Sequence, residues 1–316
     1  MTTMQTRTLG RTGLTVAVLG FGCGGVGGLM VRGDPADQER TVARAVELGV
    51  NYFDTAPQYG DGESERNIGR VLAKLKPKAF IGTKIRLAPE QKTDIAGAIR
   101  AGMEASLRRL GRDHVDLFQL HNPITHDGTG GTLTTRMVLD QVVPAFETLR
   151  RQGKTRFLGI TAIGDADALH AVIDSASFDT AQVAYNMLNL NPLAARLHAS
   201  GMGTIGIRVL AGGALSGEAR RHPIASPPPE PIDSGPDYAA DLVRAQRFRP
   251  LIAAAGATTL AEVAVRFAIG DAAMSTTLIG IATSEQFEVA AAAAAKGRLP
   301  DPVLAQLRAL WNGMHA

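Results

Sequence analysis

The chain has 316 residues, 45% of them hydrophobic and 20% charged, which is typical of a globular protein and argues against a disordered or fibrous one. Lys and Arg number 33 against 30 Asp and Glu, and the scattered charges and net charge of +3 argue against a nucleic-acid partner. The lone cysteine, Cys23, excludes an intrachain disulfide and a zinc site of several thiolates, and it favours a cytoplasmic location. Met1–Thr15 lacks the apolar core of a signal peptide, and no run of about eighteen apolar residues predicts a membrane span.

Short apolar runs of β-forming residues alternate with segments of helical spacing. The expected strands are Val18–Gly22, Asn51–Thr55, Ala79–Lys84, Val115–Leu120, Phe157–Thr161, Thr180–Tyr185, Thr204–Leu210 and Thr277–Ile281. The expected helices are Asp37–Leu48, Glu63–Leu75, Thr93–Leu110, Met137–Arg151, Ala166–Ser175, Leu193–Ala199 and Leu260–Ile269. Strands joined by helices run parallel, and nearly continuous apolar strands are typical of burial on both faces. Eight such units in about 300 residues predict a (β/α)8 TIM barrel, in one domain over residues 1–316.

A few segments stand outside this repeat. Gln5–Leu9 and Leu14–Val16 flank a Gly-Arg-Thr-Gly turn and predict a β-hairpin that closes one end of the barrel. Asn122–Thr135 and Ser216–Asp237 are long connections after the fourth and seventh strands, where a barrel builds its active site. The second contains three consecutive prolines, so a disordered insertion stays open as the alternative to a loop that closes over the site.

Four side chains with chemical capability follow three successive strands. Asp54 ends the second strand, Tyr59 lies in the next loop, Lys84 ends the third strand and His121 follows the fourth. They would meet at one rim, where the set suits proton transfer to or from an oxygen. An ammonium stabilises phenolate, so Lys84 is expected to lower the pKa of Tyr59 from its usual value of about 10. Asp54 would keep Lys84 charged, and His121 would hydrogen-bond the reacting oxygen.

Structural roles compete with these assignments. Asp54 and Lys84 could form a buried ion pair that braces neighbouring strands, and His121 could be a core histidine with satisfied hydrogen bonds. The joint pattern favours the catalytic interpretation. Cys23 has no adjacent base and is expected to pack as a small side chain, whereas His126 is either a substrate contact or a solvated loop residue.

The glycines of Gly22–Gly27 match G-x-G-x-x-G after a strand, as in a Rossmann domain that binds a dinucleotide. Residues 29–35, however, separate these glycines from the helical pattern that begins near Asp37. No helix N-terminus would then follow the glycines directly, as that motif requires. We therefore interpret them as allowing close backbone approach at the barrel mouth.

The segment around Tyr59 carries the most specific pattern in the chain. Residues 51–60 read NYFDTAPQYG, and GESE follows at residues 62–65. Together with LGRTGLTVAVLGFG (9–22), IGTK (81–84), DLFQLHNP (116–123) and QVAYN (182–186), this pattern closely resembles the aldo-keto reductases over nearly the whole chain. The resemblance implies a (β/α)8 barrel that binds a nicotinamide dinucleotide without a Rossmann domain. It also implies that Tyr59 is the general acid, that Lys84 and Asp54 tune it, and that His121 orients the carbonyl.

The resemblance also assigns cofactor-binding residues, with some departures from the usual pattern. Gln182 matches the glutamine that hydrogen-bonds the nicotinamide carboxamide. Thr161-Ala162 stands where a Ser-Asn pair is usual. Arg208 stands where an aromatic residue usually stacks on the nicotinamide, and its planar guanidinium could stack instead.

The last cofactor-binding candidates follow the eighth strand. They are Gly280, Thr283, Glu285 and Gln286. NADPH-preferring relatives usually place Lys or Arg in this segment against the 2′-phosphate, but residues 279–286 contain neither. Glu285 or Gln286 could meet a ribose hydroxyl instead, so the cofactor is NADPH or NADH, with NADH favoured. No metal is expected.

These observations predict an oxidoreductase that transfers a hydride between the nicotinamide and an aldehyde, ketone or sugar. The DTAPQYG pattern also resembles the aldose dehydrogenase branch. The alternative is a regulatory or redox-sensing protein of the same fold that holds the cofactor and turns over slowly, like the potassium-channel β subunits. In many of the proteins that the chain resembles, a long C-terminal loop narrows the pocket. Few residues follow the helical pattern near Pro302–Trp311, so the resemblance implies a wide pocket here. The substrate, the reaction direction and the oligomeric state stay open.

Overall fold

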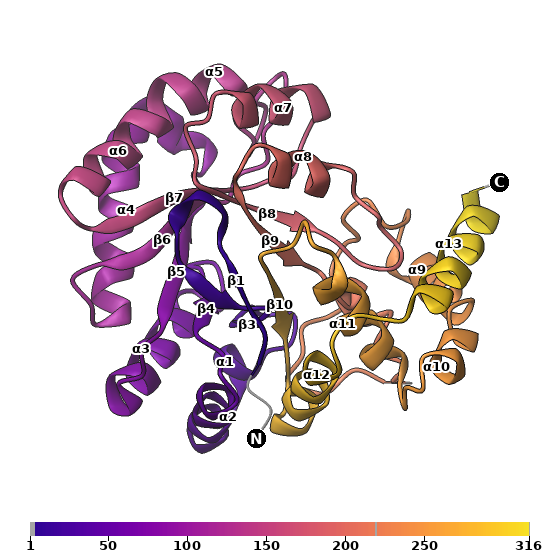
Figure 1. The fold of residues 1–316 in the computed structure, drawn as a ribbon. Helices are drawn as coiled ribbons and strands as arrows, with labels where there is room; N and C mark the ends of the chain where they lie inside the picture. Colours follow the sequence, from indigo (N-terminus) through magenta and orange to yellow (C-terminus); the bar gives the residue numbers. More distant parts are fainter. Residues whose placement is uncertain (1–3, 219, 316) are drawn as a thin grey trace.

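Eight parallel strands close into a barrel in the computed structural model, which describes residues 4–218 and 220–315 (Figure 1). The barrel strands are β3 (Leu19–Gly22), β4 (Tyr52–Asp54), β5 (Phe80–Ile85), β6 (Val115–Leu120), β7 (Thr155–Thr161), β8 (Thr180–Ala184), β9 (Gly203–Ile207) and β10 (Thr276–Gly280). They pair in the order β10-β3-β4-β5-β6-β7-β8-β9, and β10 returns to β9. The predicted (β/α)8 barrel is confirmed. Met1–Thr3, Ala219 and Ala316, which belong to predicted segments, lie outside the described residues.

Helices connect the strands and cover the outside of the barrel (Figure 1). The α-helices are α1 (Leu29–Arg32), α2 (Pro35–Glu47), α3 (Glu63–Leu75), α4 (Ile95–Leu110), α5 (Thr135–Met137), α6 (Val143–Arg151), α7 (Ala166–Asp174), α8 (Leu193–Ala199), α9 (Tyr238–Gln246), α10 (Pro250–Ala254), α11 (Leu260–Gly270), α12 (Ser284–Lys296) and α13 (Asp301–His315). The shorter helical turns are η1 (Gly10–Thr12), η2 (Pro89–Asp94), η3 (Val138–Val142) and η4 (Ala211–Gly213). Helix α4 begins later than predicted because the Asp94 carboxylate accepts the Gly97 amide and caps the helix there. Helices α1, α9, α10 and α12 were not predicted.

Strand β9 ends three residues before its predicted end. Arg208 turns into the left-handed region with φ of 59°, which ends the extended conformation after Ile207. The carbonyl of Arg208 then accepts hydrogen bonds from the Ala211 amide and the Asn186 side chain. This early turn places Arg208 at the barrel mouth.

The hairpin of β1 (Thr6–Thr8) and β2 (Thr15–Ala17) crosses one end of the barrel (Figure 1). Its apolar side chains pack against inward-facing strand residues; this cluster contains Leu9, Leu14, Val16, Tyr52, Leu117, Ile205 and Leu278. Gly10, with φ of 48°, lies so close to the backbone of Gly203, the first residue of β9, that a Cβ would clash. The hairpin therefore closes the N-terminal end of the strands, as predicted, and leaves the C-terminal end open.

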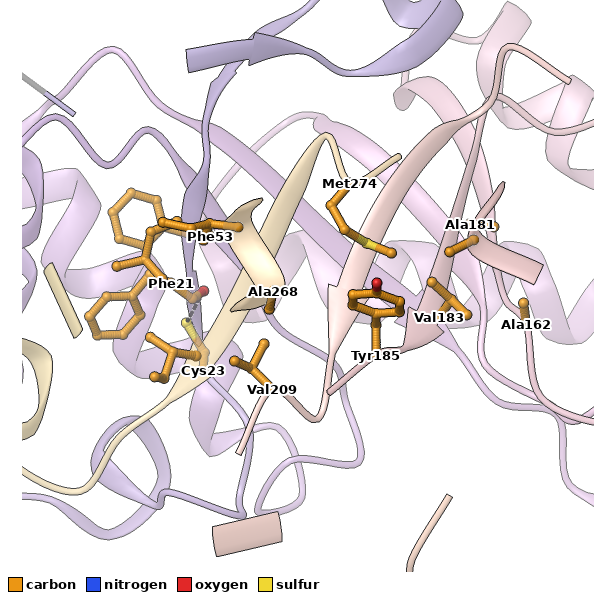
Figure 2. Packing of buried hydrophobic residues seen from close by; sticks show 14 of the residues in the cluster. Phe21, Cys23, Phe53, Ala162, Ala181, Val183, Tyr185, Val209, Ala268 and Met274 are labelled. Carbon is orange, nitrogen blue, oxygen red and sulfur yellow. Dashed lines mark hydrogen bonds between the residues drawn. The ribbon is translucent and has the colours of Figure 1, made fainter. Parts of the chain in front are cut away.

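The main core lies between the strands and the surrounding helices. The Phe21 ring lies 5.6 Å from the Phe53 ring and 5.7 Å from the Phe287 ring, centroid to centroid, which ties β3 to β4 and α12. Figure 2 shows Cys23 on the same side of the core as Phe21 and Phe53. Burial raises the pKa of the Cys23 thiol far above the ordinary value. A buried, protonated thiol is consistent with the packing role that we predicted for Cys23.

Candidate active site

Side chains joined by hydrogen bonds and an ion pair, those of Asp54, Tyr59 and Lys84, form the floor of the open barrel end. The Lys84 Nζ donates to the phenol oxygen of Tyr59 at 3.2 Å and to the Thr55 carbonyl at 2.9 Å, and it forms an ion pair with Asp54. Asp54 and Lys84 are buried, whereas Tyr59 is partly exposed. The structure thus brings together three of the four residues that the sequence singled out, and Lys84 lies between Asp54 and Tyr59 as expected.

Asp54 is held from several directions. Its Oδ2 accepts hydrogen bonds from Tyr52 at 3.1 Å, Gln119 at 3.0 Å and Gln182 at 2.6 Å, while Lys84 contacts its Oδ1. These four donors fix the position of the buried carboxylate. Gln182, expected on the nicotinamide carboxamide, contacts Asp54 here, although it also lines the cavity above.

Sequence reasoning missed Tyr52 and Gln119 in this network. Both face the barrel interior because they lie two residues before inward-facing residues, Asp54 on β4 and His121 after β6. The period of two along a strand was therefore the signal that could have found them.

The electrostatics of Tyr59 differ from expectation. Burial raises the pKa of its phenol, the Lys84 ammonium lowers it in part, and the net shift is upward from 10. The expected net lowering was wrong because the loss of hydration outweighs the nearby charge. Burial works against the charged form of Lys84, but Asp54 raises the pKa of the ammonium above its ordinary value. Both upward shifts favour the protonated forms, a neutral phenol beside a charged lysine.

His121 lies beside Tyr59, with the two rings edge-to-face at a centroid separation of 6.1 Å. Burial, with further contributions from the charges of Lys84 and Arg86, lowers the pKa of His121 to about 3. Its Nδ1 is buried and has no hydrogen-bond partner among the described residues. His121 is consequently a neutral imidazole at physiological pH, able to donate one hydrogen bond from its ring.

The floor opens into a cavity of about 1250 Å³. Asp54, Tyr59 and His121 line it together with six of the predicted cofactor residues: Thr161, Gln182, Arg208, Gly280, Glu285 and Gln286. Thr283 is not among the lining residues, and its hydroxyl accepts the Gln286 amide at 3.3 Å as the N-cap of α12. The Thr161 hydroxyl is buried without a hydrogen-bond partner among the described residues. An unpartnered hydroxyl on a cavity wall is suited to a ligand.

The glycine-rich loop after β3 forms one wall of the cavity. A Cβ at Gly27 would clash with the backbone of Ile281, and one at Gly28 would clash with the carbonyl of Ile224. The glycines thus allow close backbone approach, as interpreted from the sequence. Helix α1 does begin directly after them, contrary to expectation. Its first amide, of Leu29, is occupied by the Ile281 carbonyl at 3.1 Å.

The long loop after β9 packs on this glycine-rich wall. The Arg32 guanidinium donates to the carbonyls of Ile224 and Gly25, and the Arg221 guanidinium donates to those of Ser226, Gly212 and Val26. These bonds argue against the disordered alternative for the described residues of 216–237. Arg221 was missed by sequence reasoning because its partners are main-chain carbonyls, which leave no residue-type signal.

Arg208 and Ile207 enter the cavity from β9. Burial lowers the pKa of Arg208, and its guanidinium has no hydrogen bond or ion pair within the described part of the chain. Ile207 lines the cavity and packs against the barrel-interior cluster, continuing the inward alternation from Ile205. Sequence reasoning missed Ile207 because the strand was expected to continue beyond it.

The far end of the cavity is polar and acidic. The Gln286 Oε1 accepts from the Ala282 amide at 2.8 Å, and its Nε2 donates to the Glu218 carboxylate at 3.1 Å. Glu285 is exposed in the first turn of α12, where hydrogen bonds from its own amide and the Thr283 hydroxyl lower its pKa. Glu218 also lines the cavity and was missed, because it lies distant in sequence from the segment that it meets.

Within residues 4–218 and 220–315, no group of three or more His, Cys, Asp or Glu side chains could hold a metal ion. No helix in this described part of the chain is long and apolar enough to cross a membrane.

Comparisons with known proteins point to the same family as the sequence pattern. L-galactose dehydrogenase of Arabidopsis thaliana is 30% identical over 298 residues, which cover 91% of this chain and 87% of the relative. The NADH-specific methylglyoxal reductase of Escherichia coli is 28% identical over 199 residues, covering 57% of this chain and 59% of that protein. The solved holo form of the aldo-keto reductase AKR11C1 from Bacillus halodurans shares the fold, with a TM-score of 0.75, 24% identity and coverage of 97% and 96% of the two chains.

The family model of the aldo/keto reductases matches residues 18–312, which contain the whole barrel and every residue of the cavity floor. The chain therefore belongs to the aldo/keto reductase family.

Proposed function

We propose that this protein reduces the carbonyl group of a small molecule with Tyr59 as the proton donor. The observation that carries the proposal is the contact of the Tyr59 phenol with the buried Lys84–Asp54 pair on the floor of the cavity. Membership of the family supports oxidoreduction with a nicotinamide dinucleotide. Its relatives' names include an aldose dehydrogenase and methylglyoxal reductases, so aldehydes and sugars are the substrates to test first.

Each floor residue has a separate task in this proposal. The bound dinucleotide supplies the hydride. The neutral His121 donates a hydrogen bond to the carbonyl oxygen and orients it, and Tyr59 gives that oxygen its proton. Lys84 stabilises the phenolate that remains, and Asp54 keeps Lys84 charged and fixed. The raised pKa of Tyr59 keeps its proton available throughout the physiological range.

The cavity fits a dinucleotide. We assign the nicotinamide to the end lined by Thr161, Gln182 and Ile207, since the unpartnered Thr161 hydroxyl lies there. Arg208, which has no carboxylate partner among residues 4–218 and 220–315, is suited to the pyrophosphate or to stacking. Glu218 and Glu285 line the opposite end. Carboxylates there repel a 2′-phosphate and accept hydrogen bonds from ribose hydroxyls, which supports NADH over NADPH.

Parallel fluorescence titrations with NADH and NADPH test the cofactor, and absorbance of the reduced nicotinamide then tests turnover of aldehydes, ketones and sugars. We expect tighter binding of NADH and measurable reduction. Binding of NADH without turnover would contradict the proposal and favour the regulatory alternative, a protein that holds the cofactor. Failure to bind either dinucleotide would contradict both.

A further inference from the structure

The mouth of the cavity holds an arginine that the proposed reduction does not use. Arg86 directly follows β5. Strand alternation places it on the same side as Lys84, while Ile85 between them packs outward in the core beside α4. Arg86 lines the cavity with Tyr59 and His121, and its charge contributes to the low pKa of His121. A cation therefore lies next to the place where the reacting oxygen would bind.

The Arg86 guanidinium is available to a ligand. Arg86 is exposed, and it has no hydrogen bond or ion pair within the described residues. The loop after β6 lies beside it without crowding it, since a Cβ built on Gly131 would only reach van der Waals distance, 4.0 Å, from its Nη2. Among the carboxylates that line the cavity, Asp54 is already paired with Lys84. The others come from the loop after β9 and from α12; they are Glu218, Glu230 and Glu285.

The order of strands separates Arg86 from the phosphates of a dinucleotide. The part of the cavity left for the phosphates and the ribose is lined by segments that follow β3, β9 and β10, and these three strands are neighbours in the barrel. Strand β5 lies opposite β9, with three strands between them in either direction. Arg208 is available to the pyrophosphate on that side, whereas Arg86 faces the space left for the substrate.

We propose that Arg86 binds an anionic group of the substrate, so that the preferred substrates are carbonyl compounds bearing a carboxylate or phosphate. A guanidinium forms two parallel, charge-assisted hydrogen bonds with such groups. This inference rests on the proposed reductase function and adds its substrate class. It differs from the sugar and methylglyoxal named for the relatives, which carry no charge.

Matched acid and amide substrates test the inference. Initial rates are compared for succinic semialdehyde against 4-oxobutanamide and for 4-carboxybenzaldehyde against 4-carbamoylbenzaldehyde. We expect wild-type kcat/KM to be about 10- to 100-fold higher for each acid, as charge-assisted bonds imply. Arg86→Gln should reduce this ratio to near one through KM, and Arg86→Lys should restore part of it. Arg136→Gln removes the same charge from a side chain that is 90% exposed, and it should leave the ratio at the wild-type value.

Equal kcat/KM for acid and amide in the wild type would overturn the inference while leaving the reductase function standing. An equal loss for both substrates in Arg86→Gln would also overturn it, because Arg86 would then act through the floor or the fold. Calorimetric titration with succinate and succinamide decides the inference even if no aldehyde is reduced. Tighter binding of succinate that is lost in Arg86→Gln would support it, and equal binding would overturn it.

Discussion

The floor of the site and the dinucleotide end of the cavity are built in different ways. On the floor, Lys84 and Asp54 are buried and satisfy each other with charges and side-chain hydrogen bonds. At the dinucleotide end, Arg32 and Arg221 contact main-chain carbonyls, and neither Arg208 nor the Thr161 hydroxyl has a hydrogen-bond partner in the described part of the chain. The side chains of the floor are thus positioned before any ligand binds, whereas the dinucleotide end has hydrogen-bonding groups that a ligand could pair with. We therefore expect catalysis to depend on the first region, and cofactor affinity and cofactor choice to depend on the second.

Replacing the proton donor should have the largest effect and should separate the two regions. Tyr59→Phe removes the transferable proton and should lower kcat by about 10²–10⁴-fold, the usual contribution of a general acid. The dissociation constant for NADH, measured by fluorescence, should change less than about twofold because the residues assigned to the dinucleotide are unchanged. Wild-type turnover in this variant would refute the mechanism.

Breaking the buried ion pair should show how strongly the floor depends on it. Lys84→Met leaves the Asp54 carboxyl group buried without its cation, and should lower the free energy of unfolding by about 3–5 kcal/mol in urea denaturation. Lys74→Met is the control, since Lys74 is exposed and its pair with the partly buried Glu39 should contribute under about 1 kcal/mol. Equal losses in the two variants would show that the floor pair adds nothing specific.

The pH dependence should reflect the floor alone. Because the pKa of Tyr59 is raised above 10, the phenol stays protonated and reduction should be constant across neutral pH. The reverse oxidation needs phenolate, so its rate should rise about tenfold per pH unit from pH 7 to 9. His121, with a pKa of about 3, should add no transition near pH 6. Rate profiles in both directions check this, and a reduction rate that falls between pH 7 and 9 would contradict it.

Cofactor choice should respond to the acidic end without a change on the floor. Glu218→Gln keeps a side-chain oxygen for Gln286 but removes a charge, so the preference for NADH over NADPH should fall by about tenfold. The ratio of the two dissociation constants measures it. Glu288→Gln, at an exposed position paired with Arg44, should leave the ratio unchanged. An unaltered ratio in both variants would place the selectivity elsewhere.

The smallest effect is expected from the support beneath the floor. Tyr52→Phe removes one of the donors to Asp54 while Gln119 and Gln182 remain, and should cost about 1 kcal/mol of unfolding free energy. The dissociation constant for NADH should stay constant. A loss as large as that of Lys84→Met would show that Tyr52 is a principal partner of Asp54.

Local patterns in the sequence determined the barrel and the four floor residues. A strand followed by a helix is a repeating local signal, and the ends of parallel strands meet at one rim, so Asp54, Lys84 and His121 could be placed together from their positions alone. Tyr59 could be assigned by resemblance. The prediction of a single domain and of a cytoplasmic location stays a prediction.

Only the tertiary structure decided how these groups influence one another. The direction of the Tyr59 pKa shift depends on burial against the charge of Lys84, and no residue pattern encodes that balance. The contact of Gln182 with Asp54, the Glu218–Gln286 hydrogen bond and the packing of the long loop on main-chain carbonyls all join segments far apart in sequence. The lack of an ion pair for Arg86 among the described residues also depends on the tertiary structure, because a surface arginine pairs with a carboxylate only where a distant segment folds beside it.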